Sequence, residues 1–351
     1  MEYRQLGRSG LRVSSLSLGT MTFGGRGDFA KVGSTGAADA RRQVDECLEA
    51  GINLIDTADI YSHGLSEEIV GTAIEGRRDR VLVATKARMK MGDGANDAGL
   101  SRHHLIQACE ASLRRLGVDH IDLYQLHEWD GVTPVEETLE ALDHLVRSGK
   151  VRYVGCSNFT GWQLAKSLGV AERRGLPRYI SQQIHYSLQA REAEYELVPA
   201  GLDHGVGIMV WSPLAGGLLS GKYRRNQDPP AGSRHLTDWG EPPVRDTEQL
   251  YDIVDALLEI AEARGVSAAQ IALAWLLSRP GVSTIVIGVR TSQQLADNLA
   301  ATELELTDEE KARLDGVSRP PLIYPHWHQA ASTGDRLGEP ERTLLGPYVV
   351  R

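Results

Sequence analysis

Short apolar runs alternate with longer amphipathic segments along most of this chain. The short runs are rich in β-branched and aromatic residues and are bounded by glycines and polar loops, which is typical of strands. The longer segments repeat their apolar residues every three or four positions, which is typical of helices with one buried face. We predict eight strands, at residues 16–18, 54–55, 81–84, 121–125, 151–155, 180–184, 208–211 and 284–287, and helices that include residues 38–50, 103–116, 135–147 and 249–263.

The alternation of strands and helices indicates a parallel sheet, and eight strands are the number that closes a (β/α)8 TIM barrel of about 250 residues or more. A doubly wound open sheet is the alternative. No Pro-rich or Ser-rich linker divides the chain near its middle, which favours one barrel domain over residues 1–318. In residues 4–13, two short apolar segments flank a Gly/Ser turn, and this pattern predicts an N-terminal β-hairpin.

Three segments are longer than a barrel requires, namely residues 24–37, 223–246 and 319–351. Long loops in a compact domain are usually lids or disordered segments, and the aromatic residues in the last two favour lids. We therefore expect long loops at the C-terminal face of the barrel, with the tail 319–351 packed over or near the mouth of the active site.

Composition narrows the class of protein. The chain has 38 Lys+Arg against 47 Asp+Glu, a net charge of −9, which argues against general nucleic-acid binding. No run approaches the roughly 20 apolar residues of a membrane helix. The three cysteines are too few and too scattered for a disulfide framework or a zinc site, and we expect no metal. The N-terminal residues lack the apolar stretch of a signal peptide. These features predict a cytoplasmic protein with a small-molecule ligand.

Four polar residues follow three successive predicted strands: Asp56, Tyr61, Lys86 and His127. In a parallel barrel, the carboxyl ends of the strands meet at the active-site face. A tyrosine has a pKa near 10, and a neighbouring ammonium lowers it. A carboxylate would hold the lysine charged and oriented, and the histidine would hydrogen-bond a substrate oxygen. Together these groups would protonate an alkoxide as it forms, which is general acid catalysis.

Each of these residues also has a structural interpretation when it is taken alone. An aspartate after a strand is often a helix N-cap, and a single tyrosine is often a packed aromatic. A single lysine is usually solvated, and a single histidine is usually structural. Their shared position at one end of consecutive strands favours the functional interpretation.

Residues 51–67, GINLIDTADIYSHGLSE, strongly resemble the signature of the aldo-keto reductases. Further matches follow in the order and spacing of that family, at residues 84–86, 119–127, 149–159, 211–219 and 287–290. The resemblance covers roughly residues 1–317. It implies an NAD(P)H-dependent oxidoreductase that reduces an aldehyde or ketone to an alcohol by hydride transfer. By position, Tyr61 would be the general acid, Asp56 and Lys86 would tune it, and His127 would orient the carbonyl.

The same resemblance assigns residues to a nicotinamide cofactor, with NADPH expected and NADH as the alternative. Trp211 stands where the family usually has a tyrosine that stacks on the nicotinamide, and a flat aromatic ring is kept. Arg290 would pair with a 2′-phosphate, although several family members have a lysine at the position of Gly288 and an arginine at that of Gln294. The assigned residues are Thr20, Met21, Asp56, Ser157, Asn158, Gln183, Trp211, Ser212, Pro213, Leu214, Lys222, Gly288, Arg290, Gln294 and Asn298.

Aromatic residues on the candidate loops bear on the class of substrate. Trp129, Trp239, Tyr324 and Trp327 lie on candidate loops and would stack on a sugar face or on a lipophilic carbonyl. A reductase of a nucleotide-linked or free keto-sugar is therefore one alternative function. A cofactor-binding sensor or partner subunit, resembling the β-subunits of potassium channels that share this fold, is another.

Overall fold

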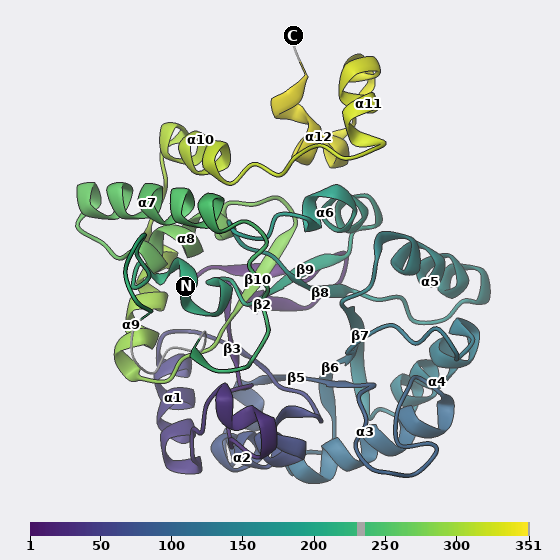
Figure 1. Cartoon of the computed structure of the whole chain (residues 1–351). Helices are drawn as coiled ribbons and strands as arrows, with labels where there is room; N and C mark the ends of the chain where they lie inside the picture. The colour runs from purple at the N-terminus through teal and green to yellow at the C-terminus, as the bar shows by residue number, and fades with distance from the viewer. Residues whose placement is uncertain (230–235, 350–351) are drawn as a thin grey trace.

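The computed structural model describes residues 1–229 and 236–349, and at its centre is a closed barrel of parallel strands (Figure 1). The strands follow one another around the barrel in chain order, and the last strand pairs with the first. They are β3 (Leu16–Gly19), β4 (Leu54–Asp56), β5 (Leu82–Ala87), β6 (Ile121–Leu126), β7 (Val151–Ser157), β8 (Ser181–His185), β9 (Gly207–Trp211) and β10 (Val282–Ile287). The predicted (β/α)8 barrel is confirmed, and the open-sheet alternative is wrong.

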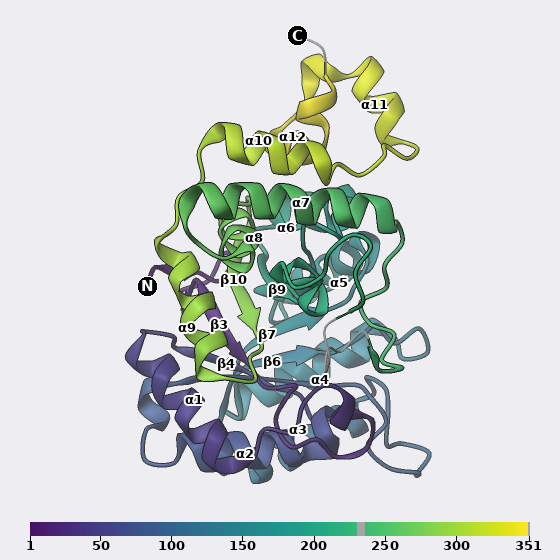
Figure 2. The same ribbon diagram turned by 60° about the vertical axis from the view of Figure 1, so that its left-hand side comes forward.

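Helices surround the barrel and bury their apolar faces against it (Figures 1 and 2). In α4, Val135, Leu139, Leu142 and Leu145 are buried, while acidic residues occupy the first turn and basic residues the last, as the helix dipole favours. The helices up to the end of the barrel are α1 (Ala37–Glu49), α2 (Leu65–Ile74), α3 (Arg102–Leu116), α4 (Val135–Arg147), α5 (Gly161–Arg174), α6 (Ala193–His204), α7 (Thr247–Arg264), α8 (Ala268–Leu277), α9 (Ser292–Ala300) and α10 (Asp308–Val317). Over the described ranges no single helix has the length and apolarity to cross a membrane, and α7 and α8, bent by 101°, pass that test only as a pair.

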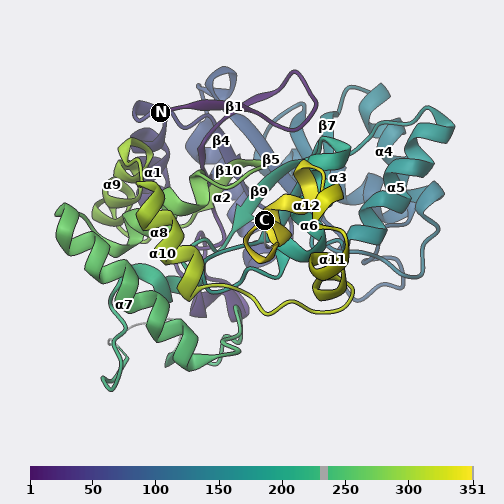
Figure 3. The same cartoon turned by 90° about the horizontal axis from the view of Figure 1, so that it is seen from above.

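The predicted N-terminal hairpin closes one end of the barrel, as Figure 3 shows at the end marked by the N-terminus. Leu6 and Val13 are fully buried in a cluster with apolar residues from the barrel strands. Gly7 has φ +58, and a Cβ atom there would lie 2.3 Å from the carbonyl oxygen of Ile180, so only glycine fits this contact. The hairpin strands are β1 (Tyr3–Gln5) and β2 (Arg12–Ser14).

The alternation of side chains along the strands divides the barrel interior into an apolar end and a polar end. On β4, Leu54 belongs to the cluster under the hairpin, and Asp56 lies two positions later. On β5, Ala84 and Lys86 have the same relationship. Side chains two residues apart point to the same face of a strand. The carboxyl ends of the strands therefore carry polar side chains into the interior at the end opposite the hairpin.

The C-terminal tail packs against α6 on the outside of the barrel (Figure 1). Leu344 and Leu345 are buried there, and Nε2 of His326 lies 3.0 Å from the backbone oxygen of Tyr195. Its helices are α11 (His326–Ser332) and α12 (Glu339–Leu345). The buried leucines of α12 therefore fix the tail against α6, and its place over or near the mouth of the active site stays a prediction.

Candidate active site

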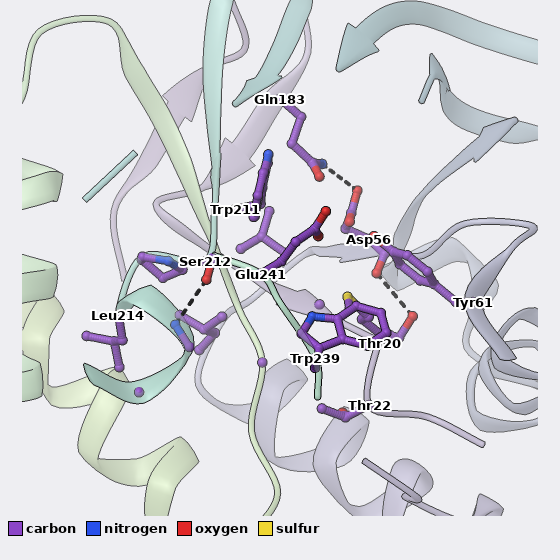
Figure 4. Close-up of a pocket in the computed structure, with 18 of the residues that line it drawn as sticks. Thr20, Thr22, Asp56, Tyr61, Gln183, Trp211, Ser212, Leu214, Trp239 and Glu241 are labelled. Carbon is purple, nitrogen blue, oxygen red and sulfur yellow. Dashed lines mark hydrogen bonds between the residues drawn. The ribbon is translucent and has the colours of Figure 1, made fainter. Parts of the chain in front are cut away.

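A cavity of about 1020 Å³ opens at the carboxyl ends of the barrel strands (Figure 4). Pockets that hold one drug-sized molecule measure about 300–1,000 Å³, so this cavity has room for a large ligand and a small second one. Asp56, Tyr61 and His127 line it, and Lys86 lies behind them with 0 % of its surface exposed. The structure thus brings together the four residues that follow separate strands in the sequence.

A chain of short contacts links three of these residues. Nζ of Lys86 lies 2.6 Å from Oδ2 of Asp56 and 3.4 Å from the hydroxyl oxygen of Tyr61. The ammonium also donates to the backbone oxygen of Thr57 at 2.9 Å. The other carboxylate oxygen of Asp56 accepts a hydrogen bond from Gln183 at 2.8 Å. The buried carboxylate is therefore fully paired, and the lysine is held with its charge directed at the phenol.

A tight turn places Tyr61 at the mouth of the barrel. The two residues that follow it, Ser62 and His63, have φ of 50° and 51°, and Gly64 has φ of 88°. The hydroxyl of Ser62 donates to the backbone oxygen of Phe23 at 3.0 Å, which fixes the turn to the preceding loop. Positive φ in non-glycine residues costs free energy and persists where the surrounding contacts over-determine it. The turn is thus held in a strained conformation by its contacts, and it orients the phenol of Tyr61.

Burial and charge act in opposite directions on Tyr61. Burial raises the pKa of the phenol, and the charge of Lys86 lowers it. Burial outweighs the lysine, so the net pKa of Tyr61 is raised rather than lowered as the sequence alone predicts. For Lys86, burial lowers the pKa, yet Asp56 and Tyr61 together raise it above its ordinary value. At neutral pH the tyrosine keeps its proton and the lysine its charge.

His127 faces Tyr61 across the cavity and is neutral. The two ring centroids are 5.8 Å apart, with the ring planes at 81°. Burial lowers the pKa of His127 well below its ordinary value, and the charges of Lys86 and Arg88 lower it further. Since a neutral imidazole carries one N–H, the ring can donate one hydrogen bond to an oxygen placed between it and the phenol.

Next to this group, amide and aromatic side chains form a flat, polar wall. The indole of Trp211 donates to Oδ1 of Asn158 at 3.0 Å and stacks on His185, with ring centroids 4.5 Å apart. The amide nitrogen of Asn158 donates to the backbone oxygen of His127 at 3.1 Å. Ser157 donates to the backbone oxygen of Gln183 at 3.0 Å. This wall offers a flat ring and amide groups to a planar carboxamide.

The rest of the cavity has the chemistry expected of a site for a dinucleotide. Two cationic residues, Lys222 and Arg290, line this part of the cavity. The guanidinium of Arg290 donates a hydrogen bond to the backbone oxygen of Val32 at 2.8 Å. Gly217 has φ +101 and nothing within 4 Å of an added Cβ, so the backbone there is open to a ligand. The remaining cofactor candidates that line the cavity are Thr20, Met21, Ser212, Pro213, Leu214, Gly288, Gln294 and Asn298.

The four aromatic residues predicted for substrate binding do not come together. Trp239 lines the cavity, and its ring lies 5.8 Å from that of Phe29. Trp129 packs instead against Phe159, with ring centroids 5.1 Å apart. Tyr324 and Trp327 lie on the tail, 72 % and 52 % exposed, and do not line the cavity. Of these four residues, Trp239 is the one that lines the cavity in the described structure.

Several residues at the cavity were not singled out from the sequence. The amide nitrogen of Gln125 lies 3.2 Å from Oδ1 of Asp56, and the alternation along β6 would have placed it in the interior. Four loop residues at the cavity closely follow a strand or adjoin a predicted site residue, and this place in the sequence could have found them: Ile60, Met89, Lys90 and Glu128. Phe29 and Glu241 lie on long loops and carry no such signal.

Comparisons with known proteins agree with this geometry. The sequence model of the Aldo/keto reductase family matches residues 15–319. The chain is 43% identical to the uncharacterized oxidoreductase YrpG of Bacillus subtilis, over 88% of this chain and 93% of that protein. It is 37% identical to versiconal hemiacetal acetate reductase of Aspergillus parasiticus, over 93% and 99%. It is also 36% identical to a probable voltage-gated potassium channel subunit beta of Arabidopsis thaliana, over 87% and 92%.

A barrel of this topology with a reductase-like site defines an oxidoreductase that works with NAD(P)H. The chain belongs to the aldo/keto reductase family. The family resemblance seen in residues 51–67 is thereby confirmed, and carbonyl reduction is the chemistry that the family supports.

Proposed function

We propose that this protein reduces an aldehyde or ketone to the alcohol by hydride transfer from NADPH, with Tyr61 as the general acid. The contacts from Asp56 to Lys86 (2.6 Å) and from Lys86 to Tyr61 (3.4 Å), which end at the cavity, carry this proposal. They give a protonated phenol at the cavity surface with a fixed positive charge behind it.

The side chains of the protein supply the proton and stabilise the charge that develops during the reaction. NADPH, when bound, supplies the hydride. The phenol of Tyr61 donates its proton to the carbonyl oxygen as negative charge develops there. The ammonium of Lys86 stabilises the phenolate that remains, and Asp56 keeps the ammonium in place. The neutral imidazole of His127 donates a hydrogen bond that orients the same oxygen.

The cofactor residues favour the phosphorylated dinucleotide. Trp211, Asn158 and Gln183 suit the nicotinamide end, Lys222 the pyrophosphate, and Arg290 the 2′-phosphate through its planar donor fork.

Arg290→Ala is expected to raise the KM for NADPH about ten- to a hundredfold, because hydrogen bonds to charged groups are worth about 1.5–3 kcal/mol. The KM for NADH should stay near the wild-type value, since NADH has no 2′-phosphate. Initial rates with each cofactor at a saturating aldehyde concentration measure the two constants. Equal losses with both cofactors would show that Arg290 supports the loop at Val32 rather than the phosphate.

A direct assay tests the proposed activity. Purified protein is mixed with NADPH, or separately with NADH, and a panel of aldehydes, quinones and keto-sugars, and the loss of nicotinamide absorbance is followed. We expect turnover of about 1 to 10³ per second on the better carbonyls, as is usual for enzymes, and faster oxidation of NADPH than of NADH. Tight NADPH binding with no turnover on any carbonyl would contradict the proposal.

A second candidate is a cofactor-binding sensor or partner subunit, and the likeness to the Arabidopsis thaliana channel subunit supports it. Co-purification with a larger partner, together with negligible turnover, would favour this candidate. The paired carboxylate, lysine and tyrosine at the cavity favour the enzyme instead.

A further inference from the structure

The part of the cavity beyond Tyr61 is bordered by two carboxylates that the reaction does not use. Glu128 directly follows His127, and Glu241 comes from the segment that also carries Trp239. Figure 4 shows Glu241 extending into the cavity alongside Trp239. Burial raises the pKa of Glu128, while the backbone N–H of Trp129 and the charge of Arg88 lower it, and the charge of Glu241 adds a smaller upward contribution. Both residues line the cavity, so two carboxylates border the space that a substrate would enter.

The two lysines near this part of the cavity are each paired with an aspartate. Lys90 lines the same part of the cavity, but its side chain is 64% exposed and lies 2.8 Å from Asp93. Lys86 is buried against Asp56 at 2.6 Å. His127 is neutral. The charge of Arg88 acts on Glu128, but Arg88 is not among the described residues that line the cavity. An anionic group that entered here would meet two like charges, and the ammonium of Lys90 is already paired with Asp93.

The adjoining walls are aromatic and apolar. The ring of Phe29 lies 5.9 Å from that of Tyr61 and 5.8 Å from that of Trp239. Met89 and Ile60 add apolar surface. Aromatic faces attract cations and accept apolar bodies, and like charges at a partly desolvated surface exclude anions.

We infer that Glu128 and Glu241 select the substrate by charge, so that this site takes neutral or cationic carbonyl compounds with an apolar or aromatic body. Carbonyl compounds that carry a carboxylate or a phosphate are poor substrates. The inference rests on the proposed reductase function and speaks against nucleotide-linked keto-sugars, which are anionic.

The test uses three benzaldehydes that differ in the para substituent: carboxylate, carboxamide and trimethylammonium. The kcat/KM of each is measured with NADPH for the wild type and for Glu128→Gln/Glu241→Gln. In the double variant, we expect the ratio of carboxylate to carboxamide to rise about tenfold or more, because two like charges are removed from the site. The ratio of trimethylammonium to carboxamide should fall several-fold. Each ratio of kcat/KM is compared between the variant and the wild type. The intrinsic reactivity of each aldehyde is the same in both proteins and therefore cancels.

Glu172→Gln/Glu262→Gln is the matched control, since both carboxylates are exposed, lie outside the cavity lining and change the net charge equally. Its ratios should equal those of the wild type. Unchanged ratios in Glu128→Gln/Glu241→Gln, or a shift of the same size in the control, would overturn the inference. If the double variant fails to fold, Glu128→Gln alone is measured instead. We expect it to change the ratios by about half as much on a logarithmic scale.

Binding of the corresponding benzyl alcohols to the NADP⁺-bound protein, measured by calorimetry, separates this inference from the proposed function. If no aldehyde is reduced but the alcohols bind in the order cationic, neutral, anionic, and this order weakens in Glu128→Gln/Glu241→Gln, the reductase function fails and the charge selection holds. If the aldehydes are reduced at rates that do not depend on their charge, the reductase function holds and the charge selection fails.

Discussion

Tyr61→Phe is expected to lower kcat about 10²- to 10⁴-fold while the Kd for NADPH stays near that of the wild type. The substitution removes the proton that the proposed general acid donates, and such donors contribute rate factors of this size. The ring itself, with its contacts to Phe29 and His127, is retained. Steady-state NADPH oxidation gives kcat, and quenching of intrinsic fluorescence on cofactor addition gives the Kd.

Tyr3→Phe is the control for this prediction. It removes a hydroxyl that donates to the backbone oxygen of Gly51 at 2.8 Å, in the hairpin at the other end of the barrel. Its kcat should match the wild type. If Tyr61→Phe retains most of its activity, another group supplies the proton, and the proposed role of Tyr61 fails.

Lys86→Met is expected to abolish measurable turnover and to lower the free energy of unfolding by about 3–5 kcal/mol, since it leaves a buried carboxylate without its cation. Gln125 and Gln183 would remain as hydrogen-bond donors to Asp56 but carry no charge. Urea denaturation followed by circular dichroism measures the loss of stability.

Adding Asp56→Asn to Lys86→Met separates stability from catalysis. The double variant has no unpaired buried charge, so we expect it to regain most of the lost unfolding free energy and to remain inactive. With Asp56→Asn alone and the wild type as the other two members of the cycle, the change for the double variant minus the sum of the changes for the two single variants gives the coupling energy of the pair. Recovery of turnover in the double variant would show that the ammonium is not needed to stabilise the phenolate.

The sequence was sufficient for the barrel and for the convergence of Asp56, Lys86 and His127. Their positions follow from local patterns: short apolar strands, helical periodicity, and polar residues at the strand ends. The period of two along a strand then brings these ends to one face of a closed barrel. The same pattern on β6 would have predicted Gln125, whose amide lies 3.2 Å from Asp56.

Other features depended on tertiary contacts that no local pattern encodes. The tail lies on α6 because Leu344 and Leu345 are buried there, which leaves Tyr324 and Trp327 away from the cavity. Glu241, on a long loop, reaches the cavity only because the fold places it there. The direction of the pKa shift of Tyr61 depends on burial, which a sequence does not give quantitatively.

The hairpin that closes the barrel beneath Leu54 and Leu123 has a practical consequence for work with this protein. The first residues of the chain leave the molecule on the side facing away from the catalytic opening. A linker joined to Met1 can therefore attach the protein to a resin, an electrode or a second enzyme without obstructing the entry of aldehyde and dinucleotide.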